Sequence, residues 1–102
     1  MEAEVKWLLA ALERLATAGW SVVSVNDGEE DIPVVEPADA VEALEGVEEG
    51  QVALMNADAT DGVTLMVVWQ GDTDSPEECI SNYAYSKRLD SEKFDALLYG
   101  RA

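Results

Sequence analysis

Apolar and polar residues alternate most clearly between residues 51 and 70. The runs Gln51–Ala57 and Val63–Gln70 are both apolar and β-prone, and a polar segment ending in Asp61 and Gly62 separates them. This is the pattern of a β-hairpin. In the second run both alternating sets of side chains are largely apolar. We therefore expect an interior strand at the centre of the sheet, covered on at least part of its second side.

Two shorter runs predict a second hairpin nearer the amino terminus. In Trp20–Val25, Val and Trp alternate with Ser, and the segment 26–28 reads Asn-Asp-Gly. These three residue types tolerate the positive φ of tight turns. The chain then returns through Ile32–Val35. Since Pro33 has no N–H to donate to a ladder, we expect this second strand to lie at an edge of the sheet.

A helical spacing of apolar residues predicts an amphipathic helix over residues 2–18. Gly19 suits the left-handed position just after its end. Trp7 lies on a strip beside the apolar stripe, where it forms the rim of the core or an exposed anchor for a partner. The expected buried stripe comprises Val5, Leu8, Leu9, Leu12, Leu15 and Ala16.

A second helix is predicted to open at residues 36–39, Glu-Pro-Ala-Asp. Proline is favoured in the first helical turn, and acidic residues there meet the positive end of the helix dipole. Gly46 and Gly50 are expected to end this helix and lead into the next strand. Its expected buried stripe comprises Ala40, Val41, Leu44 and Val47.

The carboxyl-terminal part predicts two further helices. Ser75 to Glu78 is a capping box with Pro76 at the first helical position, so we expect a third helix there. Residues 87–90 read as a break, and Ser91 is expected to cap a final helix through Tyr99 that Gly100 closes. The residues expected to pack inward from the two helices are Cys79, Ile80, Tyr83, Phe94, Leu97 and Leu98.

These elements run helix, strand, strand, helix, strand, strand, helix, helix. Two hairpins separated by a helix favour an α+β fold: a four-stranded antiparallel sheet with the helices packed on it. At 102 residues the chain is long enough for a single core, so we expect one domain over residues 1–102. Which hairpin edges meet cannot be derived from the pattern.

Charge is the unusual property of the chain. It has 22 acidic and 6 basic residues, a net charge of −16. Between Leu15 and Ser86 there is no basic residue, while 16 of the acidic ones lie in that span. Such a surface repels DNA, RNA and anionic lipid and attracts basic protein surfaces or cations. We therefore expect neither direct nucleic-acid binding nor membrane binding, and a basic protein surface as the partner.

A row of carboxylates marks the second predicted helix. Asp39, Glu42 and Glu45 are neighbours at a spacing of about 5 Å, and like charges so placed cost a few tenths of a kcal/mol per pair. No cation in the local sequence compensates them. The row is either a solvated acidic surface or charge presented to a partner. The candidate partner-binding residues are Glu29, Glu30, Asp31, Asp39, Glu42, Glu45, Glu48 and Glu49.

No motif in the sequence indicates a reaction. There is no histidine, and the lone Cys79, without a histidine to activate it, is typical of a small core residue. Phosphate-binding glycine loops, serine elbows and zinc spacings are absent, and so short a chain lacks the deep cleft of carboxylate-based glycosidases. We expect no enzymatic activity and no cofactor.

Two acidic segments invite a calcium interpretation, which their spacing does not support. Neither Asp27–Asp31 nor the pair Asp72 and Asp74 has the glycine and terminal glutamate of an EF-hand loop. No metal site is therefore expected. The acidic amino terminus, the single cysteine and the lack of an apolar run of about 18 residues together favour a cytosolic protein.

Residues 67–72, Val-Val-Trp-Gln-Gly-Asp, and 76–83, Pro-Glu-Glu-Cys-Ile-Ser-Asn-Tyr, resemble a pattern of small accessory proteins of phages and prophages. In that pattern a hydrophobic strand leads through a Gly-Asn/Asp turn to Pro-Glu-Glu-Val-Ile-Ser-Asp-Tyr. The chain departs from it in Cys79, where the pattern has valine, and Asn82, where it has aspartate. The two segments together make up 14 of the 102 residues, and the resemblance implies an accessory gene of a mobile element.

Three hypotheses follow. In the first, the protein is an inhibitor that mimics nucleic acid and occupies a basic groove of a host defence protein of the CRISPR or restriction type. In the second, its acidity is an adaptation to high salt, and folding requires molar salt. In the third, it is a small structural or regulatory domain, for instance a homodimer that buries Trp7 or the edge strand Ile32–Val35.

Overall fold

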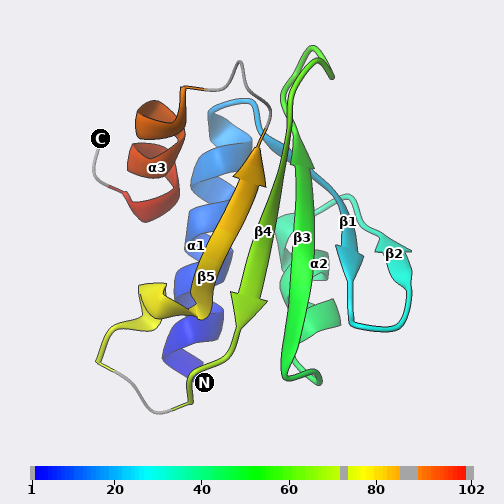
Figure 1. Cartoon of the computed structure of the whole chain (residues 1–102), viewed down its shortest axis with the longest axis vertical. Coiled ribbons are helices and arrows are strands. Elements are labelled where there is room, and N and C mark those ends of the chain that lie inside the picture. Colours follow the sequence, from blue (N-terminus) through cyan, green and yellow to red (C-terminus); the bar gives the residue numbers. More distant parts are fainter. Residues whose placement is uncertain (1, 72–73, 86–89, 101–102) are drawn as a thin grey trace.

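The computed structural model describes residues 2–71, 74–85 and 90–100. The protein is an α+β domain in which three α-helices pack against an antiparallel sheet (Figure 1). In chain order the elements are α1 (Glu2–Thr17), β1 (Ser21–Asn26), β2 (Asp31–Pro33), α2 (Pro37–Leu44), β3 (Glu49–Met55), β4 (Gly62–Val68), the 3-10 helix η1 (Pro76–Cys79), β5 (Ile80–Tyr85) and α3 (Ser91–Tyr99).

The sheet has five strands in the order β2-β1-β3-β4-β5, and every neighbouring pair is antiparallel. The two predicted hairpins are confirmed as β1–β2 and β3–β4, and they meet through β1 and β3. The edge position expected for the strand with Pro33 is also confirmed, since β2 stands at the end of the strand order, next to β1. The strand predicted over Val63–Gln70 is interior, but the central strand is β3, so that detail was wrong.

The predicted four-stranded sheet and third helix were wrong, because the chain after η1 forms a fifth strand. The capping box at Ser75 to Glu78 begins only one 3-10 turn, and Ile80–Tyr85 then pairs with β4. This pairing gives the backbone groups on the free edge of β4 a ladder of hydrogen bonds. A helix in place of β5 would have left these groups without partners in the sheet. The apolar and aromatic side chains Ile80, Tyr83 and Tyr85 also favour a strand.

The final helix is confirmed with a different cap. Asp90 is the N-cap of α3, and its Oδ1 accepts a hydrogen bond from the Lys93 N–H at 3.1 Å, so the expected cap at Ser91 was wrong. Gly100 ends the helix at φ 68°, and Gly19 follows α1 at φ 98°, both as expected. Residues 87–89 of the predicted break lie outside the described part of the chain.

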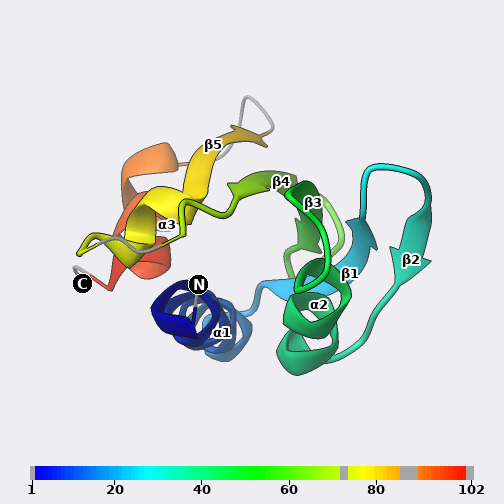
Figure 2. The ribbon, with the colours of Figure 1, turned by 90° about the horizontal axis from the view of Figure 1, so that it is seen from below.

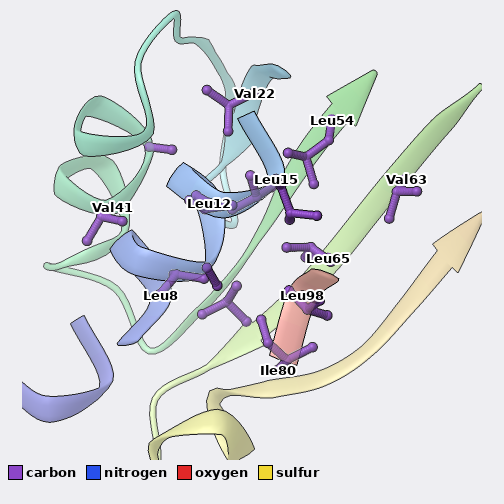
Figure 3. Packing of buried hydrophobic residues seen from close by; sticks show 14 of the residues in the cluster. Leu8, Leu12, Leu15, Val22, Val41, Leu54, Val63, Leu65, Ile80 and Leu98 are labelled. Atoms are coloured by element: carbon purple, nitrogen blue, oxygen red, sulfur yellow. The ribbon is translucent and has the colours of Figure 1, made fainter. Parts of the chain in front are cut away.

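The helices lie on the inner side of the curved sheet (Figure 2). Leucines from α1 meet leucines and valines from the sheet there, and Leu98 of α3 joins the same core (Figure 3). Trp20 packs edge-on against Phe94 at 5.3 Å between ring centroids. The side chains of β4 that point away from the helices are half-buried. All the helices lie on the other face of the sheet (Figure 2). Within the described residues, no element therefore forms the cover that was expected over this outer face of β4.

Two side chains from distant parts of the sequence cap helix ends. Trp69 Nε1 donates to the Leu44 carbonyl oxygen at 2.9 Å, at the end of α2. Arg14 donates to the carbonyl oxygens of Leu97 and Leu98 at 3.1 and 2.8 Å, at the end of α3. These bonds satisfy carbonyl groups that have no partner within the helix.

Trp7 packs against Tyr99 at 5.8 Å between ring centroids and is partly buried against the core. The interpretation of Trp7 as the rim of the core is therefore confirmed. None of the described helices combines the length and the apolar character needed to cross a bilayer.

Candidate functional site at the acidic end of the sheet

The predicted acidic residues gather mainly at one end of the sheet, the lower end in Figure 1. There the turn between β1 and β2 lies beside the connection from α2 to β3, because Asn26 pairs with both Asp31 and Gln51. We call the exposed carboxylates of these two segments, together with those of the first residues of β2 and β3, the acidic pole. Its members are Glu29, Glu30, Asp31, Glu45, Glu48 and Glu49.

Hydrogen bonds within the β1–β2 turn hold its shape. Asp27 Oδ1 accepts from the N–H groups of Glu29 and Glu30 at 2.9 and 3.0 Å. The bonds from Glu30 and Glu29 lower the pKa of Asp27, because they stabilise its charged form. Asn26 accepts from Gly28 N–H at 2.9 Å, and Gly28 has a φ of 98°. The backbone that carries Glu29 and Glu30 is therefore well defined.

Hydrogen bonds from Trp69 and close packing at Gly50 fix the α2–β3 connection in place. Trp69 N–H donates to the Glu48 carbonyl oxygen at 3.3 Å, and the Trp69 indole binds Leu44. Gly50 lies where a Cβ atom would collide with Leu44 Cδ2 and lie 2.7 Å from the Asn26 carbonyl oxygen. Only a glycine therefore lets β3 begin this close to β1 and α2.

The remaining two predicted residues lie beside the pole. Asp39 and Glu42 are exposed on α2, where they line a groove of about 470 Å³ between α2 and the segment Ile32–Val35. Val35 in this groove is 80% exposed. The structure thus places all eight candidate residues in solvent, six at the pole and two along α2. Their binding to a partner stays a prediction.

Cations do not neutralise these carboxylates within the described residues. Lys6 pairs with Glu2 at 3.4 Å on α1, and the guanidinium of Arg14 is bound to the end of α3. No described cation forms an ion pair with any of the eight candidates. Asp58 and Asp61, however, lie in the β3–β4 turn at the opposite end of the sheet. The acidic residues of the middle of the chain therefore do not all share one face.

Glu4 is a structural residue that the sequence analysis missed. Its side chain is fully buried, and its two carboxylate oxygens accept from the N–H groups of Gln70 and Gly71 at 2.8 and 3.0 Å. It thereby ties α1 to the chain that leaves β4. One signal was present in the sequence: Glu4 lies four residues before Leu8 and eight before Leu12, on the buried stripe of the helix.

Cys79 is buried near Glu4. Burial raises the pKa of the Cys79 thiol from 9.0 to about 12, and the carboxylate of Glu4 adds to the shift. A thiol with so high a pKa is a poor nucleophile. Among residues 2–71, 74–85 and 90–100, no group of three or more His, Cys, Asp or Glu is placed to hold a metal ion. Asp72 of the second acidic segment lies outside these ranges.

The raised pKa of the Cys79 thiol makes the stability of the protein depend on pH in the alkaline range. Above the unfolded pKa of 9.0 the unfolded thiol loses its proton while the folded thiol keeps it, so the folded state binds more protons and stability falls as pH rises toward about 12. From about pH 8 to about pH 10 the wild type should lose about 1 kcal/mol more than Cys79→Ala, measured by urea unfolding. Equal losses in the two proteins would contradict this.

Comparison of the chain with protein-family models, with curated proteins and with solved structures found no match.

Proposed function

We propose that this protein is a non-enzymatic inhibitor that mimics nucleic acid and occupies the basic groove of a nucleic-acid-binding protein. The observation that carries the proposal is the placement of the acidic residues. Eight exposed carboxylates without a described ion-pair partner lie at the acidic pole and along α2, on a backbone held by hydrogen bonds.

The spacing of these charges suits such a role. Duplex DNA presents about one charge per 1.7 Å of helix axis, so a protein that competes with it must present dense, uncompensated negative charge. Residues three positions apart on a helix lie about 5 to 6 Å from one another at Cβ, and Asp39, Glu42 and Glu45 follow that spacing. A rigid scaffold lets the protein bind without first ordering a loop, which would weaken the complex.

The setting that we propose is the cytoplasm of a cell that hosts a phage or another mobile element. The resemblance of residues 67–72 and 76–83 to phage accessory proteins supports it. A CRISPR or restriction component, which must bind nucleic acid through a basic surface, has the chemistry of the expected partner.

The proposal is tested by capture from host lysate at about 50 mM salt, elution with a salt gradient, and identification of the proteins released. We expect a nucleic-acid-binding protein that elutes at moderate salt. The double reversal Glu42→Lys and Glu45→Lys should weaken the complex with that protein about tenfold, because like charges then face one another. Affinity is measured by calorimetry with the purified partner.

The matched control is the pair Glu13→Lys and Asp58→Lys. It changes the net charge by the same amount but lies outside the acidic pole and the α2 row. If both double variants lose affinity equally, only net charge matters and the assignment of the surface is wrong. If no nucleic-acid-binding protein is retained at low salt, the proposed function itself is wrong.

A further inference from the structure

Trp69 lies at the acidic pole just beyond the end of β4, and both of its N–H groups are engaged in hydrogen bonds. The indole Nε1 donates to Leu44 and the backbone N–H donates to Glu48. Trp69 is half-buried, and the bond from its indole to α2 fixes the position of the ring. What the ring can still offer a ligand is its apolar and π surface rather than a hydrogen bond.

A hollow of about 470 Å³ lies next to this ring and opens to solvent. Its lining combines three kinds of residue: the aromatic Trp69, the half-buried aliphatic Val47 and Val68, and the exposed acidic Glu48 and Glu49. Glu49 pairs with Val68 in the sheet, so β3 and β4 bring these groups together from residues about twenty positions apart. We call this hollow the Trp69 pocket; its lining residues are Val47, Glu48, Glu49, Val68, Trp69 and Gly71.

The residues that line the pocket indicate what kind of side chain it would bind. An aromatic ring beside carboxylates suits a cation with an apolar stem. Arginine fits best, because its planar guanidinium stacks on aromatic rings and can donate two parallel hydrogen bonds to one carboxylate. A nucleobase could also stack on the ring, but its phosphate would be repelled by Glu48 and Glu49.

We propose that the Trp69 pocket receives an arginine side chain of the partner protein. This inference rests on the proposed function for the identity of the partner, and it names the contact that would anchor it. Buried aromatic and arginine residues are the commonest anchors of protein interfaces, while surrounding charges contribute mainly to orientation and to the rate of association. The pocket would thus add a specific contact to the diffuse attraction of the acidic pole.

The pocket is tested without any partner by titrating the ¹⁵N-labelled protein with the peptide acetyl-Gly-Arg-Gly-amide. We expect a saturable shift of the Trp69 indole N–H signal and no shift for Trp20, which packs in the core against Phe94. Peptides with lysine or citrulline in place of arginine are the matched probes. Lysine should bind about fivefold more weakly, and citrulline, which is uncharged, should give no saturable shift.

Two variants assign the signal to the pocket. Glu48→Gln with Glu49→Gln changes only exposed side chains and should weaken arginine binding about fivefold. Trp69→Phe keeps a ring but loses the indole N–H, so its signal disappears from the spectrum and binding is followed at Val68 instead. An arginine peptide that produces no saturable shift, or one that binds the double variant as well as the wild type, would overturn the inference.

The two proposals can fail separately. If the arginine peptide binds the pocket but no nucleic-acid-binding protein is captured, the proposed function is wrong and the pocket stands. If such a partner is captured and the double variant Glu48→Gln with Glu49→Gln binds it with unchanged affinity, the pocket is not its anchor and the inference is wrong.

Discussion

Replacing Glu4 with alanine is expected to lower the free energy of unfolding by about 2 to 4 kcal/mol. The carboxylate is fully buried and accepts from the N–H groups of Gln70 and Gly71. Without it, two partly buried donors lose their acceptor, and each such loss costs about 1 to 3 kcal/mol. The cavity left by the side chain adds to the cost. Urea or thermal unfolding followed by circular dichroism measures the change.

The same helix offers a matched control. Glu13 is exposed, and Glu13→Ala should change stability by no more than about 0.5 kcal/mol. Glu4→Gln keeps one acceptor oxygen and places an amide group against a backbone donor, so its cost should fall between the other two. If Glu4→Ala were as mild as Glu13→Ala, the contact between α1 and the end of β4 would not contribute to stability.

Replacing Gly50 with alanine is expected to cost about 1 to 3 kcal/mol. The added Cβ would collide with Leu44 Cδ2 and lie 2.7 Å from the Asn26 carbonyl oxygen. The leucine side chain can move, but the carbonyl belongs to β1 and is fixed by the pairing of β1 with β3. Relief therefore requires that the two strands separate locally, at the base of the acidic pole. Thermal unfolding reports the loss of stability.

Gly46 is the control for this substitution. No atom lies within 4 Å of a Cβ built on Gly46, and its φ is outside the left-handed region. Gly46→Ala should therefore be neutral or stabilise by up to about 1 kcal/mol, through the lower entropy of the unfolded chain. If both glycine variants behave alike, the close approach at Gly50 is not a constraint on the fold.

The parts of the fold that could be predicted are those with local causes. The apolar spacing of residues 2–18 predicts α1, the turn residues predict the two hairpins, and the missing N–H of Pro33 predicts an edge strand. Each signal depends on residues close in sequence. The ends of the helices at Gly19 and Gly100 follow for the same reason, since only a left-handed residue closes them easily.

The predictions failed where contacts between residues distant in the sequence determine the structure. The capping box at Ser75 is a real helix-starting signal, but Ile80–Tyr85 gains more by pairing with β4 than by continuing a helix. Glutamate is a residue type that usually lies at the surface, and only the fold brings the N–H groups of Gln70 and Gly71 to Glu4. Tertiary contacts of this kind override local propensity.

The candidate site was predictable in composition but not in arrangement. Acidic residues without neighbouring cations were expected to be exposed, and all eight candidates are. Their gathering at one end depends on the pairing of β1 with β3, which the pattern of the sequence does not contain. The Trp69 pocket has the same origin, because Glu49 and Val68 meet only through the pairing of β3 with β4.

The central claim is that the acidic pole and the α2 row take the place of nucleic acid on a basic partner. The most direct measurement is displacement: a labelled oligonucleotide bound to the captured partner is titrated with this protein at about 50 mM and about 200 mM salt. We predict complete, competitive displacement that weakens steeply at the higher salt. A partner that binds this protein and the oligonucleotide together, or with an affinity that salt does not change, would contradict the claim.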